Sequence, residues 1–365
     1  MAMQETLTRA QGTNEPTIAR PAANRVAIED DKAMLRAAVE LTRDISDARP
    51  AIYWPDMLGS AFVGYAALAG AILAEGAALT VVFAVVAVLA LYRALLFIHE
   101  LTHIHRDALP GFRFAWNLLV GIPLLTPSFM YENVHTLHHA RTRYGTREDP
   151  EYLPLALMKW WSLPLFLVTA ILLPVALLVR SAVLVPLGIV LPPVRRLVWE
   201  RASALAINPA FRRRLPTGDF GRMVFWQELG TTLWSFALVA SIFVIGWMPL
   251  AIAFGIISAV AVLNQLRTLV AHLWENEGEA MTVTAQYLDS VNVPPPGVLP
   301  FLWAPVGLRY HALHHLLPSM PYHSLGEAHR RLSAHLGMET TYARASHPGL
   351  LHLIGRIARS TMRPR

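Results

Sequence analysis

Long apolar runs alternate with polar stretches along this 365-residue chain. Two uncharged or nearly uncharged runs, 57–74 and 77–98, follow one another with only an acidic residue and a glycine between them. A second pair, 229–247 and 250–271, turns at a proline. Because about 20 apolar residues cross a bilayer as a helix, the pattern predicts four transmembrane helices in two pairs.

A fifth apolar stretch, 160–193, is interrupted by Pro164, Pro174, Arg180, Pro186 and Pro192. We expect a membrane-associated hairpin here, which enters and leaves by the same side; a single tilted span is the alternative. The shorter piece 114–129 contains a glycine and two prolines, which favours a re-entrant or interfacial segment. The predicted fold class is an all-α integral membrane protein with four transmembrane helices, this hairpin and a cytoplasmic helical cap.

The chain divides into three parts by composition. Residues 1–50 are a predicted cytoplasmic segment, disordered up to about residue 30 and then helical over 32–45. Residues 51–335 form the membrane domain, which ends in a cytoplasmic helix over 325–336. Residues 336–365 form a cytoplasmic tail.

Composition supports the membrane assignment. The chain is 54% hydrophobic and 15% charged, whereas soluble domains carry about 25% charged residues. The absence of Cys excludes disulfides, thiolate zinc sites and a catalytic cysteine. The basic residues flank apolar segments instead of forming one patch with aromatics, which excludes nucleic acid as a partner. Arginines concentrate in 194–222, so the positive-inside rule makes this loop cytoplasmic. We expect a multi-pass protein whose active site faces the cytoplasm, in the plasma or inner membrane if the chain is bacterial.

Nine of the 15 histidines form a pattern typical of metal sites. The spacing H-x-x-H-H occurs twice, although random placement gives roughly 0.025 matches in a chain of this composition. On a helix such a triplet shares one face and can point three imidazoles, the commonest protein metal ligand, at one point. The candidate ligands are His99 and His103, His135, His138 and His139, His272, and His311, His314 and His315.

The predicted topology brings these histidines to one membrane face. Each helical pair returns the chain to the cytoplasm just beyond an arginine, Arg93 or Arg267, and a hairpin at 160–193 keeps it there. A single span at 160–193 would separate the clusters. Nine imidazoles exceed the four to six ligands of one metal and imply two metals; the ligand type suits Zn, Cu, Fe or Ni. Two redox metals without thiolates favour activation of O2.

The three clusters resemble the histidine boxes of the membrane fatty acid desaturase family. The third box continues through 316–323 as Leu-Leu-Pro-Ser-Met-Pro-Tyr-His, and the second continues through 144–152 as Tyr-Gly-Thr-Arg-Glu-Asp-Pro-Glu-Tyr. His272 matches a ninth histidine that family members carry after the last membrane helix. The resemblance covers roughly residues 50–335.

This resemblance implies that all nine histidines bind two Fe ions. It implies O2-dependent desaturation of a fatty acyl lipid or thioester at the cytoplasmic face, with electrons from a separate ferredoxin or cytochrome b5 type donor. Related hydroxylases and ketolases of lipids or carotenoids share the boxes and are the alternative. Acyl-CoA desaturases of the family carry an Asn four residues before the ninth histidine; Thr268 stands there in this chain, and Asn264 one turn earlier.

Other interpretations use the same residues. His99-Glu100-Leu101-Thr102-His103 also fits the H-E-x-x-H of zinc metalloproteases, with Glu100 as the base, but leaves most of the histidines unexplained. A metal transporter would place its ligands near mid-membrane. We expect no catalytic residue beyond the metal ligands. Carboxylates that could orient metal-bound imidazoles are Glu132, Asp149, Glu275 and Asp289.

Overall fold

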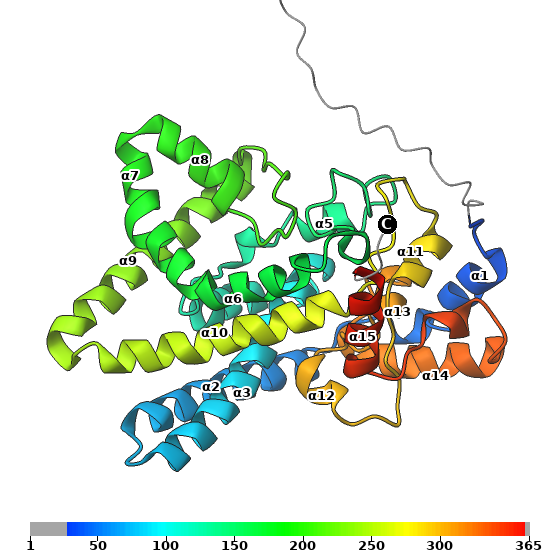
Figure 1. The fold of residues 1–365 in the computed structure, drawn as a ribbon, viewed down its shortest axis with the longest axis horizontal. Helices are drawn as coiled ribbons and strands as arrows, with labels where there is room; N and C mark the ends of the chain where they lie inside the picture. Colours follow the sequence, from blue (N-terminus) through cyan, green and yellow to red (C-terminus); the bar gives the residue numbers. More distant parts are fainter. Residues whose placement is uncertain (1–27, 362–365) are drawn as a thin grey trace, which may run out of the picture.

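The computed structural model describes residues 28–361, and within this range the fold is helical, with isolated β-bridges and no β-strand. The predicted N-terminal disorder lies almost entirely in residues 1–27, outside the described part. The all-α class is confirmed. The structure consists of a layer of long helices and a cap of short ones, which Figure 1 shows side by side.

Two helical hairpins form the predicted membrane pairs. Their helices are α2 (Pro50–Leu73) with α3 (Ala77–His103), and α9 (Gly218–Ile245) with α10 (Met248–Leu269). The turns between them contain Gly76 at φ 112° and Gly246 at φ 79°, a backbone region in which glycine carries no steric penalty. All four helices are long and apolar enough to cross a bilayer. The predicted pairs are therefore confirmed.

The stretch 160–193 differs from the expected hairpin. α6 (Ser162–Val179) continues through the π-helical segment η5 (Arg180–Leu184) into α7 (Val185–Val190), without an internal turn. Pro174 lies inside α6, and Pro186 follows the π-helical segment directly, in the first turn of α7. The chain reverses only after Val190, where α8 (Pro192–Ala202) packs against α7. Residues 162–190 are thus a fifth candidate span by length and composition.

The position of the histidines limits how many of these helices cross the membrane. His138 precedes α6 and His272 follows α10, yet their Nε2 atoms lie 3.3 Å apart. The chain between them must therefore cross the bilayer an even number of times. Since α9 and α10 account for two crossings, the α6–α8 excursion leaves on the side where it enters. A hydrogen bond of 2.5 Å from Arg180 Nε to the Ala202 carbonyl oxygen ties the outgoing and returning segments together.

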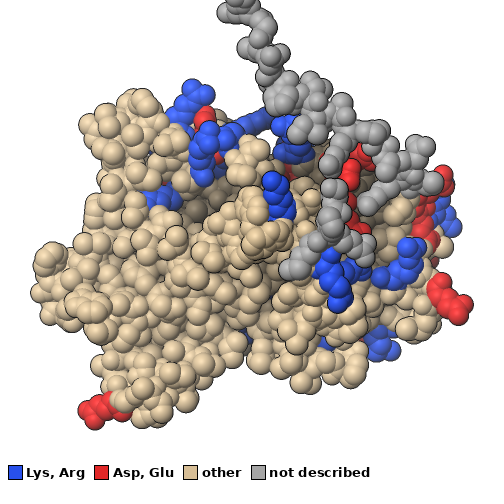
Figure 2. Space-filling view, in the orientation of Figure 1, with Lys and Arg blue, Asp and Glu red and all other residues tan. Residues whose placement is uncertain are grey.

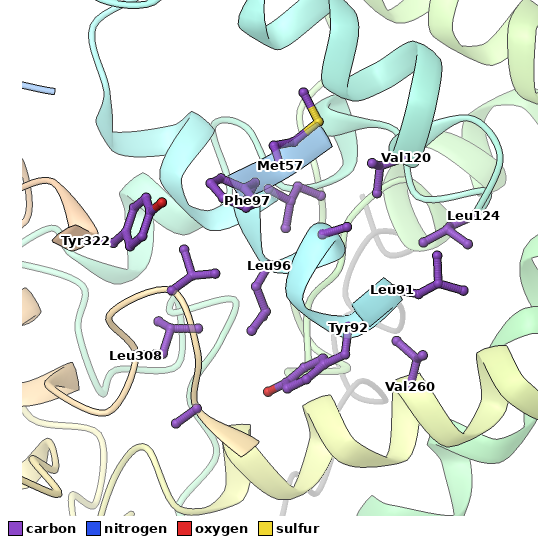
Figure 3. Packing of buried hydrophobic residues seen from close by; sticks show 14 of the residues in the cluster. Met57, Leu91, Tyr92, Leu96, Phe97, Val120, Leu124, Val260, Leu308 and Tyr322 are labelled. Carbon is purple, nitrogen blue, oxygen red and sulfur yellow. The ribbon is translucent and has the colours of Figure 1, made fainter. Parts of the chain in front are cut away.

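Close packing of small residues joins α2 to α3. Ala61, Gly64, Ala67 and Ala71 are buried on one face of α2. A Cβ added to Gly64 would lie 2.6 Å from Leu91 Cδ2, so a larger residue would require the Leu91 side chain to shift. Figure 3 shows the core that results, in which side chains of α2, α3 and α10 meet and Leu308 and Tyr322 reach in from the cap.

The surface has two distinct regions. Charged side chains gather over the cap, whereas the long helices present an almost uncharged surface (Figure 2). Many large apolar side chains of these helices are exposed, among them Phe62, Val81 and Phe243 at 75%, 60% and 88%. Such a belt matches the hydrocarbon region of a bilayer. The chain is therefore a multi-pass membrane protein.

Short helices form the cap. They are α1 (Lys32–Glu40), α4 (Phe112–Trp116), α5 (His135–His138), α11 (Val283–Asp289), α12 (Pro300–Trp303), α13 (His311–Leu316), α14 (Leu325–Leu336) and α15 (Leu350–Thr361). α1 and α14 pack together and confirm the helices expected over 32–45 and 325–336. Residues 114–129 contain no long helix, as predicted. The part of the 336–365 tail that is described ends in α15, which packs on residues 155–157.

Candidate metal centre

All nine predicted histidines meet at the junction of the long helices and the cap. Their nitrogens form two groups, and within each group the candidate ligand atoms lie within 4.8 Å of one another. The five-histidine group contains His99, His103, His135, His139 and His314. The four-histidine group contains His138, His272, His311 and His315. Seven of the side chains are buried, and only His103 and His139 are half-buried.

Each H-x-x-H-H triplet is divided between the groups, which corrects the expectation that a triplet converges on one point. His135 and His139 belong to the five-histidine group, and His138 between them belongs to the other. In the third box the middle member, His314, changes group in the same way. On a helix, side chains at i and i+4 project in nearly the same direction, whereas the side chain at i+3 projects to the opposite side of the line that joins them. Each box therefore bridges the two groups.

A short strand-like pairing fixes His272, which follows α10. His272 forms an isolated antiparallel bridge with Ser290. Backbone hydrogen bonds of 2.7 Å from Leu273 N to Asp289 O and of 3.0 Å from Val291 N to Ala271 O flank it. The imidazole is thus held by backbone on both sides although it lies outside a helix.

Carboxylates orient three of the imidazoles through Nδ1, the ring nitrogen that points away from the interior of each group. His138 Nδ1 lies 2.9 Å from Asp149 Oδ2, and His135 Nδ1 lies 2.8 Å from Glu151 Oε1. His272 Nδ1 lies 2.8 Å from the Tyr144 hydroxyl, which in turn donates to Asp289 Oδ2 at 2.8 Å. These acceptors place the ring proton on Nδ1, so Nε2 presents a lone pair to the interior of each group.

Two of the four carboxylates considered from the sequence have this role, Asp149 directly and Asp289 through Tyr144. The other two do not: Glu132 pairs with Arg113 at 2.7 Å, and Glu275 pairs with Arg356 at 3.3 Å. Glu151 was not among the predicted candidates. Its position two residues after Asp149, in the run that follows the second box, was the available signal.

The arrangement of ring nitrogens fits metal ions. In their neutral forms His138 and His272 both carry the ring proton on Nδ1, where an acceptor lies, so their Nε2 lone pairs would face one another across 3.3 Å. Facing lone pairs repel unless a cation lies between them. His99 is buried, yet neither of its ring nitrogens has a hydrogen-bond partner among the described residues. The other close Nε2–Nε2 pairs are His135–His139 at 3.0 Å, His139–His314 and His272–His311 at 3.1 Å, and His311–His315 at 3.2 Å.

Burial also selects the protonation state that binds metals. It lowers the pKa of His135, His139, His272, His311, His314 and His315, which keeps these imidazoles neutral. Burial alone would lower the pKa of His138 too, but the Asp149 carboxylate holds it above its ordinary value. Burial raises the pKa of Glu151 to about 7 and that of Asp289 to about 6. The imidazoles other than His138 whose pKa is lowered are therefore buried neutral donors.

A cavity of about 350 Å³ opens beside the two groups. His99, His138 and His272 form part of its wall, and most of the remainder is apolar surface of α3, α6 and α10, including Leu173 and Ile257. A largely apolar cavity with imidazoles in its wall fits a hydrocarbon chain.

The comparisons with known proteins agree with this geometry. The family model described as "Fatty acid desaturase" matches residues 75–346, about three quarters of the chain. The chain belongs to the fatty acid desaturase family. It is also 48% identical over 335 residues to a protein of Caulobacter vibrioides (strain NA1000 / CB15N) named "Ceramide hydroxylase", a match that covers 90% of this chain and 94% of that protein. No solved structure matches.

Membership of the desaturase family and the surroundings of Glu100 both argue against the zinc protease alternative. Glu100 Oε2 accepts hydrogen bonds from the Tyr53 hydroxyl at 2.5 Å and from Tyr322 N at 3.2 Å. The carboxylate is therefore an internal acceptor between α2, α3 and the cap. The family also has histidine-ligated metal centres, which accounts for all nine clustered histidines in place of the few a protease needs.

Proposed function

We propose that this protein is a ceramide hydroxylase, which inserts one oxygen atom of O2 into a C–H bond of its lipid substrate. The observation that carries the proposal is the apolar cavity that ends at the two histidine groups. The named relative, 48% identical over most of both chains, supports hydroxylation of a ceramide over the desaturation expected from the sequence.

The proposed reaction balances with one molecule of O2, two electrons and two protons. One oxygen atom replaces the substrate hydrogen as a hydroxyl, and the other leaves as water. Desaturation would use the same inputs but would remove two hydrogens and release two waters. We propose that a separate one-electron carrier, of ferredoxin or cytochrome b5 type, delivers the electrons at the cytoplasmic face.

The nine histidines are the proposed ligands of two iron ions, which would supply the activation of O2. Asp149, Glu151 and the Tyr144–Asp289 pair keep the ring protons on the outer nitrogens and fix the imidazole planes. The apolar wall binds the hydrocarbon chain by burial, at about 0.8 kcal/mol per CH₂ group. Exclusion of water by the same wall protects the reacting carbon from competing chemistry.

The test is lipid product analysis with isotopically labelled dioxygen. The purified protein in lipid nanodiscs, loaded with ferrous iron and supplied with a reductant, is given a ceramide. We expect a product that carries one labelled oxygen atom, and about two irons per chain by elemental analysis. A product with a new double bond and no added oxygen would instead support the fatty acid desaturase activity that the family model's description names. One zinc and no iron would refute both.

A further inference from the structure

Polar side chains line the part of the cavity wall formed by Thr126 and by the last two turns of α10, which lead to His272. We refer to this part as the polar end of the cavity; it consists of Thr126, Asn264, Arg267 and Thr268. Thr126 precedes η3 (Ser128–Met130), and the other three lie on the last two turns of α10. They are not among the metal ligands proposed above.

Several polar atoms of these side chains have no hydrogen-bond partner among the described residues, although the Arg267 guanidinium also interacts with the Tyr92 hydroxyl. Thr126 and Arg267 are only 6% and 8% exposed, yet Thr126 Oγ1 and Arg267 Nε have no hydrogen-bond partner among residues 28–361. The side chains of Asn264 and Thr268 make no hydrogen bond within the described part of the chain either. Unpaired polar groups in a water-poor, membrane-embedded wall are costly, so they indicate a polar ligand.

Away from the histidines and their partners the remainder of the cavity wall is largely apolar, and its polar side chains Thr169 and Gln265 already donate to the Phe166 carbonyl oxygen. On α10, Asn264 lies about 8 Å from the end of the helix at Leu269, whereas Ile257 lies about 18 Å from it. Around and beyond Asn264 the wall includes Val260 and Ala261, and opposite them Leu173 of α6. The cavity therefore has a polar end beside the metal centre and an apolar end away from it.

The donors and acceptors at the polar end match a secondary amide with a neighbouring hydroxyl. The Asn264 carboxamide both donates and accepts, as a secondary amide does, while the Arg267 Nε–H donates only. The Thr126 and Thr268 hydroxyls can complete the set around a carbonyl or hydroxyl oxygen. A ceramide carries an amide and hydroxyl groups at the junction of its chains.

We propose that the polar end of the cavity binds the amide and hydroxyl groups of the ceramide, so that hydroxylation occurs close to this polar linkage and not in mid-chain. The assignment rests on the proposed function. An extended chain advances about 3.5 Å in three bonds. The 8 Å between Asn264 and the end of α10 thus places the reacting carbon within about seven bonds of the amide.

The experiment compares ceramide with an analogue in which an ester replaces the amide and so lacks the N–H donor. For the wild type we expect kcat/KM to be about tenfold lower for the ester, equivalent to about 1.4 kcal/mol. Asn264→Leu should lower kcat/KM for ceramide about tenfold, mainly through KM, and bring the ratio of the two substrates close to one. Asn264→Gln should restore part of the preference.

Two controls separate recognition from folding. Ser258→Ala makes a comparable change on α10 outside the cavity wall, where the hydroxyl donates to Ile171 O, and should leave the preference intact. The iron content and the thermal midpoint of Asn264→Leu should match the wild type. Weakened equilibrium binding of a fluorescent ceramide, measured without reductant, provides a readout that does not depend on turnover.

The position of the new hydroxyl, mapped by tandem mass spectrometry, decides between the outcomes. A hydroxyl within about seven bonds of the amide and a reduced preference in Asn264→Leu support the assignment. A mid-chain hydroxyl, an unchanged preference, or loss of iron from Asn264→Leu overturns it while the proposed function stands. If the wild type oxidises no ceramide, the proposed function fails, and the assignment fails with it.

Discussion

Asp149 offers the sharpest test of how the protein supports its metal centre. The side chain is fully buried, and each of its oxygens already has a backbone donor: Glu151 N donates to Oδ1 and Gly145 N donates to Oδ2, both at 2.8 Å. His138 Nδ1 lies within 3.0 Å of both oxygens. Asp149→Asn replaces one acceptor oxygen with an NH₂ group of nearly the same shape. At least one of the N–H groups that now donate to the carboxylate would then point at the NH₂ group, which is itself a donor.

The expected cost has two parts. Loss of a hydrogen bond to a charged acceptor costs about 1.5–3 kcal/mol, and the buried donor left without a partner costs about 1–3 kcal/mol. We therefore expect the free energy of unfolding to fall by about 3–5 kcal/mol. Because the neighbouring imidazole also loses its fixed orientation, metal affinity of the four-histidine group should fall about 10–100-fold, which corresponds to about 1.4–2.8 kcal/mol.

The assay is a chelator titration of the purified variant, with iron per chain and the thermal midpoint measured at each step. Glu148→Gln is the matched control, since this side chain is adjacent in sequence but 71% exposed. We expect Asp149→Asn to lose about half of its iron at chelator concentrations that leave the wild type and the control fully loaded. Equal retention of iron by all three proteins would refute the idea that this carboxylate positions His138.

Three further predictions follow from the two-group geometry. His314→Ala and His315→Ala should each abolish product formation. Only His315 shares a group with His138, so only His315→Ala should remove the same iron that Asp149→Asn binds less tightly. When each is combined with Asp149→Asn, iron loss should be additive for His314→Ala and non-additive for His315→Ala. Glu100→Gln should lower the thermal midpoint, because Glu100 accepts from Tyr53, yet keep a good fraction of hydroxylation; complete loss at normal iron content would contradict this role. Removal of iron with a chelator should lower the thermal midpoint reversibly, with about 2.7 kcal/mol regained at a ferrous iron concentration 100 times the dissociation constant.

The hydrophobic pattern was sufficient to predict the membrane pairs but not their full extent. Hydropathy starts the third span at residue 229, whereas α9 begins at Gly218. The intervening turns contain Glu228, which a hydropathy count penalises. In the structure Glu228 is buried and paired with Arg180 at 2.6 Å and with Arg195 at 2.7 Å. A charge neutralised by a partner about 50 residues away leaves no local signal, so the helix extension could not be predicted.

The same limit applied to 160–193. Local rules treat several prolines and an arginine as helix breakers, which favoured an early turn. The helix instead passes through a π-helical segment at Arg180, whose side chain is satisfied by the Ala202 carbonyl and by Glu228. The even number of membrane crossings between the second box and His272, by contrast, follows from the prediction that the nine clustered histidines share one membrane face. That prediction is confirmed by the proximity of their side chains.

At the metal centre, spacing identified the histidines but not their allocation. The i, i+3, i+4 rule places a triplet on one face, and whether the middle member joins its neighbours depends on where the second group lies. His138 turns to His272, which comes from the far end of α10 and is 134 residues away. The supporting residues Glu151 and Tyr144 were missed for a related reason: an acidic or aromatic residue in a loop has no periodicity to mark it.

Different helices supply the clustered histidines and the cavity wall, which explains how one proposed ligand set could serve different reactions. The cap helices α5 and α13, together with His139 directly after α5, supply six of the nine histidines. From these two helices only histidines line the cavity. The cavity itself is built largely from α6 and α10, which contribute a single histidine between them, His272, just beyond α10. Substitutions along α10 could therefore change which carbon reaches the proposed metals without disturbing the proposed ligands. If separate helices bind the metals and position the substrate, one family can contain different activities. This chain agrees with that expectation, because it matches a family model described as fatty acid desaturase and is also similar to a protein named ceramide hydroxylase.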